Sequence, residues 1–114
     1  SIFIDQIMVI GDGKKFPAGI IQPNFDALKN WAGKNGHELP KENSDIIKSK
    51  EILNIISKEI DLINSKFGSW EMLKDYRLTA DIWSVDEGHL TPTMKLKRSS
   101  ILEKYRELFE SIYS

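Results

Sequence analysis

The chain has 114 residues, which suits one domain and is too short for two. Its 16 basic and 17 acidic residues give a net charge of -1, which argues against a general nucleic-acid binder because such proteins are usually basic. The absence of cysteine excludes disulfides, thiolate zinc sites, iron–sulfur clusters and a thiol nucleophile.

The first 22 residues carry the pattern of a β-hairpin. Residues 4–10 are apolar and β-rich, and residues 16–22 read as the returning strand. Between them, the Asp12-Gly13 pair favours a tight reversal because glycine tolerates positive φ. These glycines do not match a dinucleotide-binding loop, since Phe16 occupies the third glycine position and a strand follows instead of a helix.

Two helical patterns come next. Asn24 is a suitable N-cap for a short helix that reaches about Lys34. A long helix is predicted from about Ser44 to Phe67, where Gly68 ends it. Its apolar stripe consists of Ile46, Leu53, Ile56, Ile60, Ile63 and Phe67, widened by Ile52 and Ile55.

The remaining residues predict a strand, a loop and a final helix. Residues 70–73 read as a short helical turn, and the alternation over 77–85 predicts a third strand. A loop follows over 86–97, and Ser100 and Glu103 form a capping box for the last helix. The apolar face of that helix consists of Ile101, Leu102, Tyr105, Leu108, Phe109 and Ile112.

The β-β-α-α-β-α order predicts a small α+β domain in which helices pack on a short three-stranded sheet. No apolar run approaches the roughly 20 residues of a membrane span, so no transmembrane segment is expected.

Most residues of chemically active types have an ordinary structural explanation. His37 and His89 are the only histidines, and neither has a metal-ligand spacing; His37 is expected to be exposed in a polar loop. Asp86 and Glu87 read as a solvated turn. Packing in the core accounts for the spacing of Trp31, Trp70, Trp83 and Phe67.

Residues 88–98 are harder to explain by packing. This segment lies between a predicted strand and a predicted helix, and it holds glycine, proline, two threonines and the cations Lys95, Lys97 and Arg98. Such a loop suits binding of a phosphate or a carboxylate, because lysine offers a mobile charge and threonine hydroxyls add donors. On these grounds alone, an exposed basic loop leading into a helix is slightly favoured over an anion site.

Residues 90–98, Leu-Thr-Pro-Thr-Met-Lys-Leu-Lys-Arg, resemble the C-terminal motif of the long-chain fatty-acid–CoA ligases, a branch of the adenylate-forming superfamily. In that group the motif reads Leu-Thr-Pro-Thr-x-Lys-x-Lys-Arg. Residues 4–12 resemble the strand at the start of the family's mobile domain, and 16–25 the following strand and helix start. Residues 64–78 and the helix around Tyr105 also correspond, so the resemblance covers nearly the whole chain.

The resemblance implies a two-step reaction. A fatty acid and ATP give an acyl-adenylate and pyrophosphate, and CoA then displaces AMP to form the thioester. ATP, Mg²⁺ and CoA would serve the full-length enzyme, and none is expected to bind this domain alone. The implied partner is a large N-terminal adenylation domain of the same chain, against which the small domain rotates. The implied location is cytoplasmic, with peripheral membrane association left open.

The same resemblance implies that residues 1–114 are a single domain cut from a larger ligase and inactive by itself. The chain begins with Ser1 and lacks the family's phosphate loop, adenine-binding segment, Mg²⁺-binding glutamate and acyl tunnel. The acyl-chain length is not encoded in this part.

By resemblance, Lys95 is the lysine inserted between the fatty-acid carboxylate and the α-phosphate for adenylation. Most other branches have glycine before this lysine, where this chain has Met94. Lys95 is preferred to Lys97 because its Lys-x-x-Arg spacing to Arg98 matches the wider pattern. Lys97 and Arg98 would shape the loop or contact the large domain. The residues expected to position the loop are Thr91, Pro92 and Thr93.

Two alternatives remain open. One is a stand-alone α+β module that binds a partner through its basic loop; a start codon close to Ser1 would support it. The other is the same domain from a ligase for a short-chain or aryl acid. The Leu-Thr-Pro-Thr string and the missing glycine weigh against that second alternative.

Overall fold

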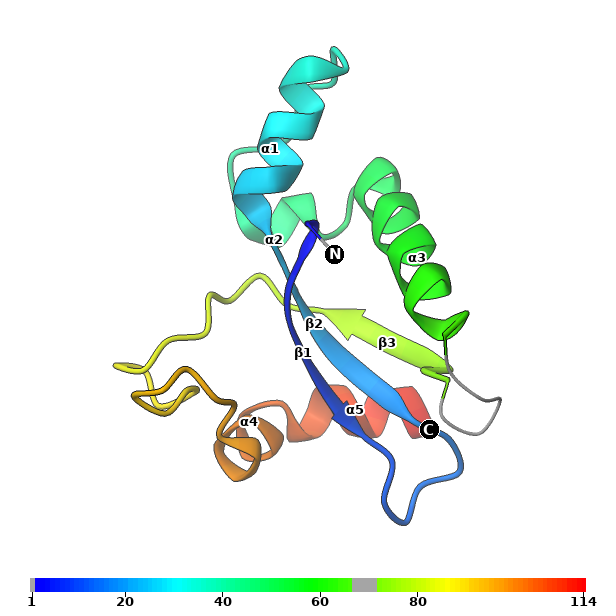
Figure 1. Cartoon of the computed structure of the whole chain (residues 1–114), viewed down its shortest axis with the longest axis vertical. Coiled ribbons are helices and arrows are strands. Elements are labelled where there is room, and N and C mark those ends of the chain that lie inside the picture. The colour runs from blue at the N-terminus through cyan, green and yellow to red at the C-terminus, as the bar shows by residue number, and fades with distance from the viewer. Residues whose placement is uncertain (1, 67–71) are drawn as a thin grey trace.

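A three-stranded sheet organises the fold. The computed structural model describes residues 2–66 and 72–114, and the sheet contains β1 (Ile4–Ile10), β2 (Ala18–Pro23) and β3 (Asp75–Leu78) in the order β1-β2-β3 (Figure 1). Strand β2 is antiparallel to β1 and parallel to β3, and all six of its residues are buried. The predicted α+β class with a short three-stranded sheet is confirmed.

The predicted hairpin is confirmed. The Lys14 N–H donates to the Gly11 carbonyl at 3.0 Å, and Gly13 has a φ of 73°, which glycine adopts without steric cost. The returning strand begins at Ala18, not at Phe16 as predicted. The reason is Pro17, which has no N–H to donate to the ladder.

Helix α1 (Phe25–Lys34) forms as predicted, with Asn24 as its N-cap. The Asn24 side-chain oxygen accepts the Ala27 N–H at 3.1 Å, which satisfies one of the free donors of the first turn. A turn of polar residues then leads to the next helical segment.

The prediction of one continuous helix over 44–67 is wrong. The structure has a short α2 (Asn43–Ile46) and a separate α3 (Lys50–Asn64), with Ser49 as the N-cap residue of α3. The break resets the helical phase, because Ile46 and Ile52 are both fully buried but would lie about 120° apart around one straight helix. Leu53, predicted on the apolar stripe, is consequently 41% exposed.

Part of the predicted helix end lies outside the described residues. Phe67 and Gly68 are not described, nor are Trp70 and Glu71 of the predicted helical turn. Among the described members of the stripe, the fully or largely buried ones are Ile46, Ile52, Ile56 and Ile60, whereas Ile55 and Ile63 are partly buried.

The third strand is shorter than the predicted range of 77–85. Its register ends at Ile21 opposite Leu78, followed by a last backbone hydrogen bond from the Thr79 N–H to the Ile21 carbonyl at 2.9 Å. Pro23 closes the ladder because it has no N–H for a further rung. The chain then leaves the sheet, and the Trp83 N–H donates to the side chain of Gln22 at 2.9 Å instead.

The final helix is divided at Tyr105 into α4 (Arg98–Lys104) and α5 (Arg106–Tyr113). The predicted capping box at Ser100 and Glu103 is wrong, because α4 already begins at Arg98 and no side chain caps it. The predicted apolar face is confirmed: its buried members are Ile101, Tyr105, Phe109 and Ile112, and Leu102 and Leu108 are partly buried.

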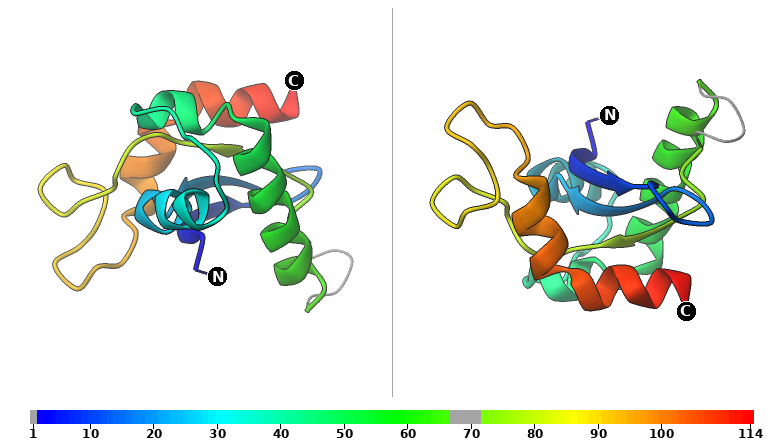
Figure 2. Two further views of the ribbon diagram at one scale, coloured as in Figure 1. Left: turned by 90° about the horizontal axis from the view of Figure 1, so that it is seen from above. Right: turned by 90° about the horizontal axis from the view of Figure 1, so that it is seen from below.

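The helices cover both faces of the sheet. On one face, Ile21 belongs to a core cluster with residues of α1, α2 and α3. On the other, Ile20 belongs to a cluster with residues of α4 and α5 and with Trp83. In the left view of Figure 2, α5 runs along one side of the strands. Across residues 2–66 and 72–114, no helix has the length and hydropathy needed to cross a bilayer.

Candidate functional site

The predicted anion-binding segment forms a loop closed at its base. We call residues 90–97 the lysine loop. An antiparallel bridge pairs Leu90 with Leu96, and the Lys97 N–H donates to the His89 carbonyl at 2.8 Å. Leu90 is 1% exposed and anchors the base in the core. The loop itself projects from the body of the domain (Figure 1).

Thr91 organises the tip of the lysine loop. Its N–H donates to the Lys95 carbonyl at 2.8 Å, and its carbonyl accepts the Met94 N–H at 2.8 Å. Its hydroxyl accepts the Lys95 N–H at 3.1 Å and lies 3.0 Å from the hydroxyl of Thr93. Pro92 follows at the position where its fixed φ favours a turn. The backbone of Lys95 is therefore held on both sides by one threonine.

Met94 has a φ of 67°, in the left-handed region. This conformation costs about 1–2 kcal/mol for a residue other than glycine. Glycine adopts this conformation without steric cost, which agrees with the glycine at the matching position in the wider superfamily that residues 90–98 resemble. The left-handed backbone was not predicted, although that family pattern was a signal for it.

The structure separates the three cations that are adjacent in the sequence. Lys95 lies in the turn with its side chain exposed. Lys97 is the N-cap residue of α4. Arg98 reaches back to β1, where its guanidinium donates to the Val9 carbonyl at 2.9 Å and lies 3.8 Å from the sulfur of Met8. Among the described residues, none forms a hydrogen bond or ion pair with the amine of Lys95.

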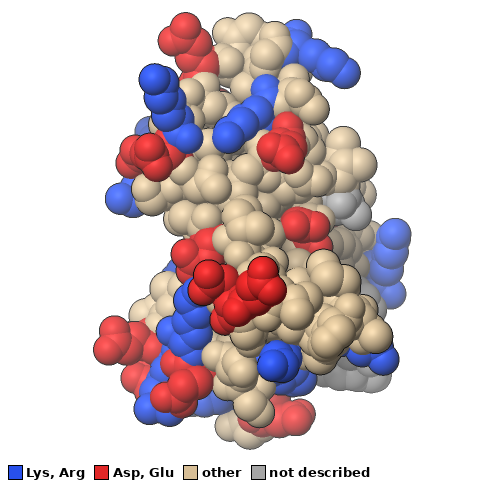
Figure 3. All heavy atoms as spheres, turned by 90° about the vertical axis from the view of Figure 1, so that its left-hand side faces the viewer, with Lys and Arg blue, Asp and Glu red and all other residues tan. Residues whose placement is uncertain are grey.

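The face from which the lysine loop projects carries charges of both signs. Figure 3 shows Lys and Arg side chains interspersed with Asp and Glu on this side of the molecule. This mixture differs from the extended basic surface that nucleic-acid binding requires.

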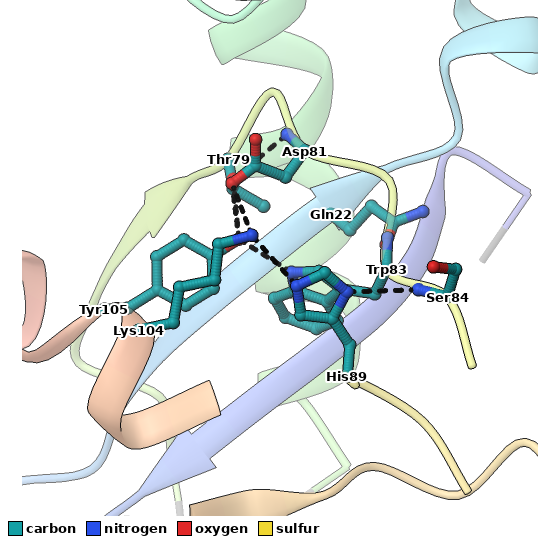
Figure 4. A network of polar contacts seen from close by, with 8 residues as sticks. All are labelled: Gln22, Thr79, Asp81, Trp83, Ser84, His89, Lys104 and Tyr105. Carbon is teal, nitrogen blue, oxygen red and sulfur yellow. Dashed lines mark hydrogen bonds and ion pairs between the residues drawn. The ribbon is translucent and has the colours of Figure 1, made fainter. Parts of the chain in front are cut away.

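A partly buried polar network is centred on the hydroxyl of Tyr105 (Figure 4). This hydroxyl accepts the indole N–H of Trp83 at 2.8 Å, donates to Asp81 Oδ2 at 2.7 Å and lies 3.3 Å from the hydroxyl of Thr79. Trp83 and Tyr105 were predicted only as core residues, so the network was missed. The alternation of Thr79, Asp81 and Trp83 was the available signal, since residues two apart share a face.

The network keeps its acid charged and its phenol neutral. The hydrogen bond from Tyr105 and the attraction of Lys104 lower the pKa of Asp81. Lys104 Nζ lies 3.5 Å from Asp81 Oδ2. Burial raises the pKa of Tyr105, so its hydroxyl keeps the proton that it donates.

The two histidines have different surroundings. His37 is exposed, as predicted, and stacks on Trp31 with 5.1 Å between ring centroids. His89 is 4% exposed and lies at the base of the lysine loop, a position that its sequence context did not reveal. Burial and the nearby Lys104 lower the pKa of His89.

The loop offers an ammonium group and hydroxyls, but no carboxylate cage for a divalent cation. Within the described ranges, no three His, Asp or Glu side chains are grouped to hold a metal ion. The lysine loop thus holds the mobile ammonium of Lys95 on a fixed backbone. Such a group is suited to contact an anion that is bound by another domain or molecule.

Solved structures of other proteins contain a similar fold. One is the adenylation domain of a carboxylate reductase from Mycobacterium chelonae, with a TM-score of 0.71 and 20% identity over 97% of this chain and 16% of that chain. Another is a didomain of a carboxylic acid reductase from Segniliparus rugosus in complex with AMP, with a TM-score of 0.72 and 18% identity over 99% of this chain and 14% of that chain. The fold is thus one found in adenylation-domain structures.

Sequence relatives define the group more closely. Long-chain-fatty-acid–CoA ligase 6 of Rattus norvegicus is 34% identical over 114 residues, covering 97% of this chain and 16% of the ligase. The ligase FadD15 of Mycobacterium tuberculosis is 28% identical over 111 residues, covering 97% of this chain and 18% of that ligase. No family model matches the chain. The chain is homologous to the C-terminal part of the long-chain-fatty-acid–CoA ligases, and it spans less than a fifth of their length.

Proposed function

We propose that this chain acts as the mobile C-terminal domain of an AMP-forming long-chain-fatty-acid–CoA ligase and carries Lys95 into the active site for acyl-adenylate formation. The observation that carries the proposal is the geometry of the lysine loop. Two hydrogen bonds to Thr91 fix the backbone of Lys95 while its amine stays exposed and without a partner among the described residues.

The proposed chemistry follows from this placement. The ammonium of Lys95 would lie between the fatty-acid carboxylate and the α-phosphate of ATP, which otherwise repel each other. It would hold the two anions in reacting geometry and neutralise charge that grows as pyrophosphate leaves. ATP, Mg²⁺ and CoA would bind mainly to the large N-terminal domain, which is the proposed partner of this domain.

The lysine loop is also built to move as one piece with its domain. Arg98 ties the start of α4 to β1, and Lys97 ties it to His89. A rotation of the domain between the adenylation pose and the thioester pose would then carry Lys95 without rearranging the loop. The guanidinium of Arg98 is bonded to the Val9 carbonyl, which favours a lysine over Arg98 as the inserted cation. Between the two lysines, the preference for Lys95 rests on its Lys-x-x-Arg spacing to Arg98.

Substitution of Lys95 by alanine in the complete ligase tests the proposal. Loss of one preorganised cation at a reacting phosphate commonly costs roughly 10²–10³ in rate. Acyl-adenylate formation, measured by pyrophosphate release in a single turnover, should fall by about that factor in Lys95→Ala. Thioester formation from supplied acyl-adenylate should stay close to the wild-type rate.

Lys97→Ala is the matched control, because it removes an equally exposed lysine two residues away. Its adenylation rate should stay within about threefold of wild type, well short of the loss expected at a reacting group. A large loss in Lys97→Ala together with a small one in Lys95→Ala would assign the role to Lys97. An equal loss of both half-reactions in Lys95→Ala would reject the insertion role altogether.

A further inference from the structure

His89 lies where the two ends of the lysine loop meet. Its carbonyl accepts the Lys97 N–H at 2.8 Å, and its own N–H donates to the Ser84 carbonyl at 3.0 Å. The next residue, Leu90, forms the bridge to Leu96. The backbone of His89 therefore joins the chain that enters the loop to the chain that leaves it.

The side chain of His89 lies between the same two ends. The Ser84 N–H donates to Nδ1 at 3.2 Å, on the segment that precedes the loop. Nε2 lies 2.9 Å from Nζ of Lys104, on the helix that follows the loop. The ring also packs beside Trp83, with 6.4 Å between centroids, and the side chain is almost fully enclosed (Figure 4).

The bond from Ser84 requires Nδ1 without a proton, so the neutral ring carries its proton on Nε2, beside the Lys104 amine. Protonation of Nδ1 turns the acceptor of the Ser84 N–H into a donor and breaks this bond. It also places a positive charge beside Lys104. The other charged groups that act on the ring are Asp81 and Glu87, which raise the pKa of His89, but burial and Lys104 outweigh them and lower it.

We infer that His89 is a positioning residue for Lys95: its neutral ring accepts the Ser84 N–H and so fixes the base of the lysine loop, and its protonation loosens the loop and selectively slows acyl-adenylate formation. This inference rests on the proposed function of Lys95. It adds a pH-dependent element that acts on one of the two half-reactions.

The sign of the pH effect follows from the direction of the shift. The pKa of His89 is lowered from 6.5 in the folded protein. The closed loop base is therefore fully stable above about pH 6.5 and is lost as the pH falls through the lower folded value. Below that value, the population with a neutral ring falls about tenfold for each pH unit.

His89→Asn in the complete ligase is the decisive variant. The asparagine Oδ1 lies near the position of Nδ1, so it is able to accept the Ser84 N–H, and it does not titrate. In wild type, the adenylation rate should fall at acid pH; in His89→Asn, the rate relative to the variant's own value at pH 7.5 should fall much less. His37→Asn removes the exposed histidine and should keep the wild-type profile.

The thioester half-reaction provides the contrast. With supplied acyl-adenylate, wild type and His89→Asn should have the same pH profile. The inference is overturned if the adenylation rate of His89→Asn falls at acid pH as it does in wild type. It is also overturned if the variant changes the pH dependence of both half-reactions equally.

Hydrogen exchange gives a readout that does not depend on catalysis or on the variant's folding. In the wild-type ligase, protection of peptides within 90–97, corrected for intrinsic exchange, should fall between pH 7.5 and pH 5.5, while peptides from α3 stay protected. Unchanged protection of 90–97 would contradict the inference. If Lys95→Ala leaves adenylation intact, the proposed function fails, but this measurement still tests whether His89 holds the loop.

Discussion

The Tyr105 hydroxyl illustrates how one buried atom connects several segments. It accepts from Trp83 and donates to Asp81, and both partners lie on the irregular chain that follows β3. Because Trp83 is 4% exposed, water has little access to replace a lost partner of its indole N–H. The hydroxyl therefore holds this chain against the helix break between α4 and α5.

Tyr105→Phe removes this hydroxyl and leaves the Trp83 indole N–H buried without its acceptor. We expect the free energy of unfolding to fall by about 1–3 kcal/mol, the usual cost of an unsatisfied buried donor. Denaturant unfolding of the chain measures it. Tyr113→Phe is the control, since its hydroxyl donates to the Phe16 carbonyl and has no other hydrogen bond among residues 2–66 and 72–114, and it should cost about 1 kcal/mol or less. Equal losses in the two variants would contradict the role of the network.

The same variant should weaken the acid dependence of stability. The pKa of Asp81 is lowered from 3.8, mainly by the hydrogen bond from Tyr105, so this carboxylate stabilises the fold above about pH 3.8 and the effect is lost as the pH falls through the folded value. Tyr105→Phe should raise the pKa of Asp81 toward 3.8. A carbon-detected NMR titration of Asp81 in both proteins checks this direction.

For single residues, the sequence predicted which side chains are buried better than it predicted which partners they bond. The core position of Tyr105 follows from its helical spacing. The hydrogen bond from Tyr105 to Asp81 does not follow from that spacing. Asp81 comes near Tyr105 because the chain leaves the sheet after β3, where Pro23 ends the ladder. His89 was missed for the same reason, since its burial depends on contacts with α4.

Among the elements, those set by local chemistry were predicted well. The reversal at Gly13 and the cap at Asn24 each need only neighbouring residues, and both are confirmed. The break between α2 and α3 and the early end of β3 depend on packing against β2. The apolar residues over 44–67 fit one continuous helix, so the sequence pattern did not reveal the break between α2 and α3.

The helix break predicts opposite outcomes at two adjacent residues. Ile52 is fully buried, so Ile52→Ala should lower the free energy of unfolding by about 2–4 kcal/mol. Leu53 is 41% exposed, so Leu53→Ala should cost less than about 1 kcal/mol. Denaturant unfolding of the two variants distinguishes this phase from that of one continuous helix, in which Leu53 would be the costlier loss.

On the scale of the whole molecule, Arg98 links the lysine loop to the sheet. Its guanidinium bonds the Val9 carbonyl of β1, although the two residues are far apart in sequence. The sequence alone identified Arg98 as part of a motif, and it left open whether the side chain faces the loop, the body or another domain. The structure shows that it contacts the body.

Arg98→Ala should therefore weaken the attachment of the whole lysine loop to β1. We expect the domain to lose about 1 kcal/mol of stability, as for one exposed charged hydrogen bond, and adenylation in the complete ligase to slow more than thioester formation. Arg106→Ala is the control, because Arg106 is exposed and, in the described part of the chain, its ion pair is with Glu103 one turn earlier. Single-turnover rates of the two half-reactions measure the difference, and equal behaviour of the two variants would contradict the link.

The position of β2 has a consequence for how the domain folds. The hairpin with β1 forms from neighbouring residues, whereas β3 joins β2 only after α1, α2 and α3 have been synthesised. The helices that cover Ile20 come later still. During synthesis, this strand would therefore expose one apolar face until nearly all of the described chain has left the ribosome, and transiently exposed apolar surface of this kind favours aggregation.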